Sequence, residues 1–160
     1  MKQAILITTL ARYQTDFWIP VARGLERCGH RTSLLCFDDP SHLLAQRAGL
    51  DSHNAFALAA TPEPLDEDAL EAATRRWMGC NLSLATSHER LAYGLRDGQL
   101  IRNKLSHSLR AASAAIAAVR ARGDEVVVIQ ELGGFASVIG TYVAARAAKI
   151  DNLFIEPSFY

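Results

Sequence analysis

The chain has 160 residues, of which 49% are hydrophobic and 21% charged, and 17 basic residues balance 17 acidic ones. This length fits one domain with its own core, and the composition excludes intrinsic disorder. A free-standing nucleic-acid-binding domain usually carries a basic excess, so the zero net charge argues against that class. The three cysteines form no CxxC spacing, which predicts reduced thiols rather than disulfides or zinc ligands.

Neither a secretory signal nor a membrane span is expected. The apolar run near the start is interrupted by Arg12 and Asp16, and the alanine-rich stretch at 111–119 is much shorter than a bilayer-spanning helix. These features predict a cytoplasmic protein. Peripheral contact with the inner face of the membrane stays open.

The first part of the chain predicts two strands joined by a helix. Residues 3–9 form the continuous apolar run that is typical of a buried parallel strand. A helix is expected to begin near Thr15 or Asp16, both good N-caps, and to end at Gly29. Residues 30–37 then form the second strand.

The middle of the chain is predicted to be mainly helical. Ser41 is expected to cap a short helix, residues 51–58 to form a third strand, and Asp66 to cap a helix that reaches Met78. From 82 to 122 the apolar spacing is helical, with a break near Gly94 and Gly98.

The last part reads as a β-α-β unit. A strand at 126–129 is followed by the turn 131–135, ELGGF, then by a helix through Lys149 and a second strand at 153–155. Strands joined by a helix run parallel. The whole pattern predicts an α/β fold, a three-layer Rossmann-like parallel sheet flanked by helices, in a single domain over residues 1–160. The first strand is expected near the centre, with the 126–129 strand beside it and the 153–155 strand beyond.

Two carboxylates follow the strands of this unit. Glu131 and Glu156 are both expected at the carboxyl edge of the sheet, where open parallel sheets bind ligands. A carboxylate there can accept a hydrogen bond from a hydroxyl or remove its proton. We therefore predict Glu131 and Glu156 as catalytic residues. The alternative for each residue is a purely structural role, either as a solvent-exposed acid in a loop or as a cap for the segment that follows.

Substrate-binding residues are predicted at the same edge. Thr9 and Arg12 follow the first strand, and an arginine there can hold a carboxylate or phosphate. Gly133 and Gly134 let a backbone approach a ligand, and amides at the start of a helix favour anions. Ser158, two residues after Glu156, is included in the predicted set. A surface role for the arginine and a plain turn for the glycines are the alternatives.

No metal site is predicted. His88-Glu89 begins like the HExxH motif, but Ala92 stands where the second histidine would be. The other histidines are scattered through the sequence. The aromatic residues near the first turn, Tyr13, Phe17 and Trp18, are interpreted as packing residues rather than as a surface for ligand stacking.

Two segments resemble a known family. The run from Phe17 to Thr32, FWIPVARGLERCGHRT, is similar to the first helix and second strand of GT-B glycosyltransferase N-terminal domains, in which the early proline, the leucine and the Gly-His pair recur. The segment 153–157, LFIEP, resembles bacterial capsule and lipopolysaccharide glycosyltransferases of the Kdo-transferase kind. In those proteins a strand ends in an acid that glycine commonly follows, whereas this chain has Pro157.

This resemblance implies one half of a two-domain enzyme. The chain would be the N-terminal, acceptor-side domain of a longer glycosyltransferase that builds a bacterial surface polysaccharide, and Glu156 or Glu131 would bind or deprotonate a hydroxyl of a sugar or glycolipid acceptor. The nucleotide-sugar donor, for which CMP-Kdo is the candidate, would be held by a C-terminal domain outside this sequence. No cofactor is expected in the chain itself.

A second hypothesis belongs to another class of protein. The chain could be a self-contained flavodoxin-like binding or regulatory domain that holds a phosphate-bearing ligand at the glycine turn. A gene that continues into a second α/β half would favour the glycosyltransferase, and a stop codon after Tyr160 would favour the binding domain.

Overall fold

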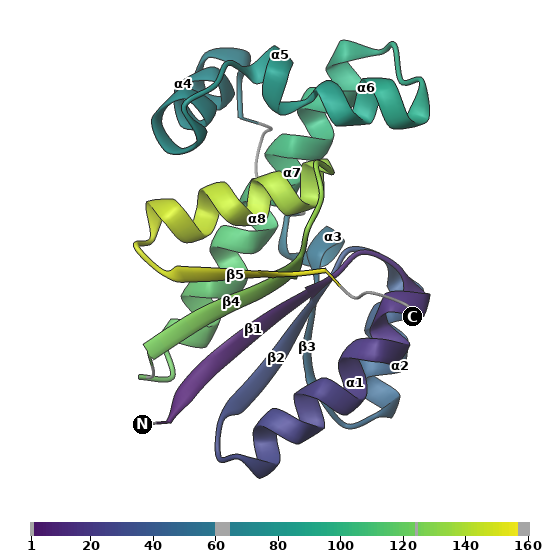
Figure 1. Ribbon diagram of the computed structural model, residues 1–160, viewed down its shortest axis with the longest axis vertical. Coiled ribbons are helices and arrows are strands. Elements are labelled where there is room, and N and C mark those ends of the chain that lie inside the picture. Colours follow the sequence, from purple (N-terminus) through teal and green to yellow (C-terminus); the bar gives the residue numbers. More distant parts are fainter. Residues whose placement is uncertain (1, 60–64, 124, 157–160) are drawn as a thin grey trace.

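The computed structural model describes residues 2–59, 65–123 and 125–156. They contain a sheet of five parallel strands in the order β3-β2-β1-β4-β5 (Figure 1). The predicted order is confirmed, because β1 is central, β4 lies beside it and β5 lies beyond. The bounds of the strands are β1 Gln3–Thr9, β2 Arg31–Cys36, β3 Asp51–Asn54, β4 Glu125–Glu131 and β5 Asp151–Ile155.

Helices cover both faces of the sheet, as the predicted three-layer fold requires. Helices α1 (Arg12–Arg27) and α2 (Asp39–Arg47) pack on one face, and α7 (Gly98–Arg120) and α8 (Ala136–Ala147) pack on the other (Figure 1). From β1 the chain proceeds outward to β3, and from β4 it proceeds outward to β5. The direction therefore reverses between β1 and β4, the position at which sheets of this kind bind ligands.

The core has one layer on each side of the sheet, because successive side chains of a strand point to opposite faces. On β1, Ala4 and Leu6 pack towards α7, whereas Ile5 and Ile7 pack towards α1. Burial on both faces explains why the central strands are continuously apolar rather than alternating.

Three further helices form a cap beyond the sheet. This helical cap comprises α4 (Glu67–Met78), α5 (Leu82–Ala85) and α6 (Ser87–Tyr93), which lie together at the top of Figure 1. A third apolar cluster joins it to α7 and α8 through residues such as Leu70, Leu82, Leu105 and Ile139. The cap is the upper part of the site described below.

Two helix starts and one strand end differ from the prediction, each because a side chain accepts hydrogen bonds from nearby backbone amides. Helix α1 begins at Arg12 rather than at Thr15 or Asp16, since Oε1 of Gln14 accepts the amides of Leu10 at 2.8 Å and Ala11 at 3.1 Å.

Helix α2 begins at Asp39, because Asp38 rather than Ser41 is its N-cap. Strand β3 ends at Asn54 instead of Leu58, because Asn54 caps the short helix α3 (Ala55–Leu58).

Other boundaries match more closely. Asp66 caps α4 by accepting the amide of Ala69 at 2.7 Å, as predicted. The helical region 82–122 has the predicted break between Gly94 and Gly98, and an additional break at Thr86 that separates α5 from α6. Among the described residues, no helix is long and apolar enough to cross a bilayer.

Helices α7 and α8 are in close contact at Gly140. A Cβ atom added there would lie 2.6 Å from the backbone nitrogen of Leu109 and 2.8 Å from Cβ of Ser108. The neighbour is backbone, so it cannot move aside as a flexible side chain can. The glycine therefore sets the distance between the two helices.

Replacing Gly140 with alanine should force α7 and α8 apart. We expect a loss of about 1–3 kcal/mol in the free energy of unfolding, measured by urea denaturation. Gly24→Ala on α1 is the matched control, because its Cβ would meet only Nη2 of Arg27, at 3.8 Å, among the described residues. Alanine is favoured over glycine in a helix by about 1 kcal/mol, so the control should be neutral or stabilising. Equal losses in the two variants would contradict the packing argument.

Candidate functional site

A pocket of about 800 Å³ lies at the carboxyl ends of the strands. Leu10 and Ala11, which follow β1, line one side together with Phe37, which follows β2. Phe135, between β4 and α8, lines another side. The remaining walls come mainly from α6, through Glu89 and Tyr93, and from α7, through residues such as Lys104. The pocket thus adjoins the reversal point between β1 and β4, where this class of fold binds ligands.

The walls of the pocket are largely aromatic and aliphatic. Phe56 is 55% exposed and Tyr93 is 58% exposed, which is unusual for rings of this size inside a packed domain. The ring of Tyr93 lies 5.8 Å from that of Phe135. Such walls fit a ligand with an apolar face, while a few polar groups orient it. The polar groups of the lining are Gln14, Glu89, Asn103, Lys104, His107, Ser108 and Ser137.

Glu89 is a buried carboxylate in this lining, with only 2% exposure. Its Oε2 accepts a hydrogen bond from Nζ of Lys104 at 2.6 Å, and its Oε1 accepts the amide of Ala136 at 2.9 Å. One side chain of α6 thereby joins α7 to the first turn of α8. A helix start favours an anion, and here a carboxylate of the protein occupies part of that position.

Lys104 has a second neighbour besides Glu89. Its Nζ lies 5.8 Å from the centroid of the Tyr93 ring, within the range of a cation–π contact. The side chain of Lys104 is 43% exposed. The polar end of the pocket is therefore a lysine held between a carboxylate and an aromatic ring.

Gln14 connects the pocket to Glu131. Besides capping α1, Gln14 donates a hydrogen bond from Nε2 to Oε2 of Glu131, and Nε1 of Trp18 donates to Oε1 at 3.2 Å. Burial raises the pKa of Glu131 above its ordinary range, and the hydrogen bond from Trp18 offsets part of that rise. Glu131 itself does not line the pocket, because it points to the α1 face of the sheet.

The other predicted site residues near the strand ends lie apart from the pocket lining. Thr9 is buried, and its Oγ1 lies 2.7 Å from Oγ1 of Thr15 on α1. Arg12 is exposed as the first residue of α1, and Glu156 is exposed directly after β5. Ser158 lies outside the described residues. Adjacent strands β4 and β5 do place Glu131 next to Ile155, the residue before Glu156.

The two glycines form a turn against which α6 packs. A Cβ atom on Gly134 would lie 2.7 Å from Cβ of His88, and one on Gly133 would lie 3.0 Å from the ring of Phe135. The ring of His88 stacks edge-on against Phe135 at 4.7 Å. Close helix packing is thus a structural reason for glycine at position 134, and the turn carries Phe135 into the pocket wall.

His107 is the histidine of the pocket lining. Burial lowers its pKa, and the charge of Arg110 lowers it further, so the ring is neutral at pH 7. The ring lies 5.2 Å from that of Phe56, and its buried Nε2 has no hydrogen-bond partner among the described residues. No group of three or more histidine, cysteine or acidic side chains gathers as metal ligands in that part of the chain.

The main lining residues of the pocket are not among those predicted from the sequence. Gln14, Glu89 and Lys104 carry no motif that marks them, and their partners are remote in sequence. The aromatic residues had a usable signal, because Phe37 and Phe135 follow predicted strand ends. Tyr13 was interpreted as a packing residue, but it is 68% exposed and lines the pocket. Trp18, in contrast, is fully buried, as the packing interpretation requires.

Removing the Glu89 carboxylate should destabilise the fold. Glu89→Ala leaves Lys104 and the amide of Ala136 without their partner, and breaking a buried pair costs about 3–5 kcal/mol. We expect a loss at the lower end of that range in urea denaturation, since Lys104 is partly exposed. Glu89→Gln should lose less because its amide oxygen can still accept from Ala136. The exposed Glu125→Ala is the control and should change stability by less than about 0.5 kcal/mol.

The raised pKa of Glu131 predicts a pH dependence. The folded state holds a proton on this group more strongly, so the stability that protonation contributes is present below its ordinary value of 4.5 and is lost as pH rises through the raised pKa. Glu131→Gln abolishes this titration. The variant should therefore gain stability relative to the natural chain between pH 4 and pH 7 in urea denaturation. A difference between Glu131→Gln and the natural chain that stays constant with pH would contradict the assignment.

Comparison with solved structures finds a similar fold in parts of several glycosyltransferases. Neither a protein-family model nor a curated protein matches the sequence. Glycosyltransferase VinC, solved in complex with dTDP, matches with a TM-score of 0.52 and 13% identity, over 94% of this chain and 33% of VinC. SsfS6 from Streptomyces sp. SF2575 has a TM-score of 0.48 and 15% identity, over 95% of this chain and 38% of its own.

The calicheamicin glycosyltransferase CalG4 gives similar values, with a TM-score of 0.49 and 16% identity over 99% of this chain and 33% of its own. This chain therefore corresponds to about a third of the length of each protein. The described residues form the α/β, Rossmann-like sheet found in one half of GT-B glycosyltransferases.

Proposed function

We propose that this chain is the acceptor-binding half of a glycosyltransferase that uses a nucleotide sugar, and that the acceptor occupies the 800 Å³ pocket. The observation that carries the proposal is the position of this aromatic-walled pocket beside the β1–β4 reversal. The likeness to VinC supports a glycosyltransferase fold, and the short coverage of VinC leaves room for a second half that would hold the donor.

The chemistry of the pocket defines the acceptor in outline. Its apolar walls would receive the ring faces of a sugar or the apolar part of a glycolipid. Asn103, Ser108 and Ser137 would hydrogen-bond to hydroxyl groups. A glycolipid intermediate of a bacterial surface polysaccharide has both features, and CMP-Kdo remains the candidate donor in the longer enzyme. Residues 1–160 would then be its N-terminal domain.

The proposed catalytic residues act at the edge that faces the donor half. Burial raises the pKa of Glu131, and Gln14, which lines the pocket, donates a hydrogen bond to its carboxylate. Glu131 would act as a general base on an acceptor hydroxyl that reaches this edge from the pocket. Glu156 is exposed at the carboxyl end of β5, where a second half could contact it. Arg12, also exposed, would meet an anionic group of the substrate. Gly133 and Thr9 would shape the edge between them.

The self-contained phosphate-binding domain has weaker support. That hypothesis needs free amides at the start of α8, but the carboxylate of Glu89 accepts the amide of Ala136 at 2.9 Å. A phosphate entering there would have to approach a buried negative charge. The glycosyltransferase reading does not require an anion at this position.

Ligand-dependent thermal stability tests the proposal. A ligand that binds only the folded chain raises its melting temperature by mass action. We expect 4-nitrophenyl glycosides to raise it more than free sugars do, because the aryl group fills the apolar part of the pocket. UDP and CMP should not compete with the glycosides for this pocket. Stabilisation by a nucleotide but by no glycoside would overturn the proposal.

A pocket-filling variant locates the binding site. Asn103→Trp places a large side chain at an exposed lining position and should abolish stabilisation by the aryl glycosides while leaving the melting temperature of the free chain nearly unchanged. Gln46→Trp, on the exposed surface of α2, is the matched control and should bind like the natural chain. Binding that survives Asn103→Trp would exclude this pocket as the acceptor site.

A further inference from the structure

A second pocket lies inside the helical cap and shares no lining residue with the first. Its volume is about 270 Å³, just below the range of about 300–1,000 Å³ in which drug-sized ligands bind. It therefore fits a small group rather than a whole cofactor. Its lining is mainly polar and charged: Glu67, Glu71, Arg75, Asn81, Leu82, Ser83, Thr86, Arg90, Gly98 and Arg102.

One arginine of this lining is already neutralised. Oε1 of Glu71 lies 2.6 Å from Nε of Arg75, and its Oε2 accepts the amide of Leu82 at 2.6 Å. The hydrogen bond from Leu82, together with Arg75, holds the pKa of Glu71 below its ordinary range. Glu71 thus stays ionised, and each of its oxygens already has a partner.

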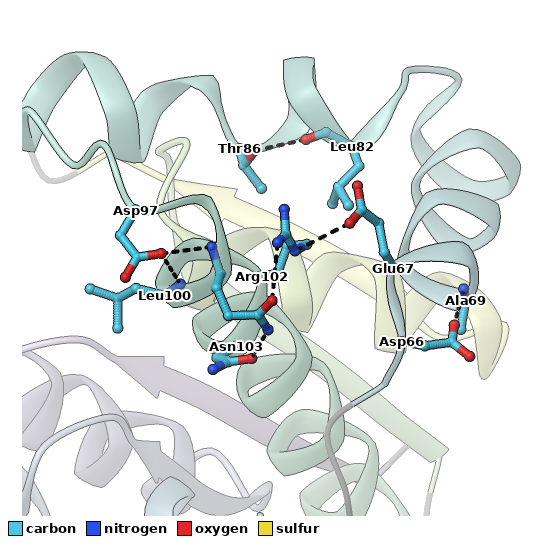
Figure 2. Close-up of polar contacts among 10 residues, drawn as sticks. Asp66, Glu67, Ala69, Leu82, Thr86, Asp97, Leu100, Arg102 and Asn103 are labelled. Carbon is cyan, nitrogen blue, oxygen red and sulfur yellow. Dashed lines mark hydrogen bonds and ion pairs between the residues drawn. The ribbon is translucent and has the colours of Figure 1, made fainter.

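Arg102 is only partly paired. Figure 2 shows it extending from α7 towards Glu67 of α4, and its Nε lies 3.5 Å from Oε2 of that residue. Nη2 of Arg102 donates to Oε1 of Gln99 at 3.0 Å. Its third nitrogen, Nη1, has no hydrogen-bond acceptor among the described residues and lies beside Gly98.

Arg90 approaches the same point from α6. The position that a Cβ atom of Gly98 would take is 3.2 Å from Nη1 of Arg102 and 3.8 Å from Nη2 of Arg90. Arg90 makes no hydrogen bond or ion pair with the described part of the chain. Two guanidinium groups thus converge over a residue that has no side chain to fill the space between them.

We propose that Arg90 and Arg102 bind the oxygens of a phosphate group above Gly98. The two guanidinium groups that approach Gly98 carry like charges and repel each other, and an oxyanion that accepts hydrogen bonds from both removes the repulsion. Guanidinium groups present paired N–H donors that match phosphate oxygens. The start of α7 does not supply the site, because Asp97 already accepts the amides of Gln99 and Leu100 (Figure 2).

The phosphate can belong to a free diphosphate or to a lipid headgroup. Leu91 on α6 is 84% exposed and Leu100 on α7 is 45% exposed, so exposed apolar side chains lie on the same helices as the two arginines. The shared chemistry is a phosphate held by two arginines, and the two sources differ in whether a membrane surface is needed. This inference does not depend on the proposed glycosyltransferase activity.

Calorimetric titration of the chain with inorganic pyrophosphate tests the site. We expect saturable binding that weakens as sodium chloride is added, because exposed charges are screened. Arg90→Gln and Arg102→Gln should each weaken it about tenfold or more, since hydrogen bonds to charged groups contribute about 1.5–3 kcal/mol. Arg47→Gln, an exposed arginine at the end of α2, is the matched control. No binding by the natural chain to either pyrophosphate or lipid, or equal binding by all variants, would overturn the proposal.

A substitution that mimics the ligand separates binding from folding. Gly98→Asp places a carboxylate between the two guanidinium groups, at the first position of a helix where an acid is favourable. It should abolish phosphate binding while keeping or raising the melting temperature. Undiminished pyrophosphate binding by this variant would contradict the assigned position.

Co-sedimentation with vesicles identifies the source of the phosphate. Binding to phosphatidylcholine vesicles that contain phosphatidic acid, but not to phosphatidylcholine alone, would assign the site to a lipid headgroup if Arg90→Gln and Arg102→Gln abolish it. Binding of pyrophosphate without vesicle binding would support a free phosphate compound. Vesicle binding that both variants retain would place the membrane contact elsewhere and contradict a lipid role for this pocket.

Discussion

The buried carboxylate of Glu89 is the constraint on which the arrangement of α6, α7 and the start of α8 depends. A charge with 2% exposure needs partners, and its two oxygens find them on different helices, at Lys104 and at the amide of Ala136. Helices α6, α7 and the start of α8 are therefore held in one arrangement. Because Phe135 and Lys104 belong to the segments so joined, the same interaction positions two parts of the pocket lining.

Much of the sheet could be predicted because its signals are local. Residues 3–9 are apolar throughout, as two-sided burial demands, and Asp66 is an N-cap whose effect depends only on the next few residues. The start of α1 could not be predicted in this way, since it depends on the side chain of Gln14 turning back to two amides. The short helix after Asn54 likewise replaced half of an expected strand. Local capping decided each of these boundaries.

The candidate site was harder to predict because it is assembled from segments that are far apart in sequence. Sequence position indicates the carboxyl edge of the sheet, and the pocket residues Leu10, Phe37 and Phe135 lie at that edge. It did not indicate on which face each side chain would lie. Glu131 points towards α1, whereas the pocket opens on the side of α7, so a shift of one residue along a strand decides the outcome. Glu89 had no distinguishing signal, since its partners are 15 and 47 residues away.

The contact at Gly140 bears on how the pocket could change its width. Helix α7 carries Lys104, His107 and Ser108, while the segment entering α8 carries Phe135 and Ser137. Since the two helices meet at Gly140 without a gap, these five lining residues lie on elements that are packed directly against each other. Closure around a ligand would then be a shear of α7 and α8 together against the loops that follow β1 and β2. Phe37, in the loop after β2, would lie on the stationary side. Variation in ligand size among related sequences would accordingly be accommodated at Phe37 and Phe56 rather than on α7.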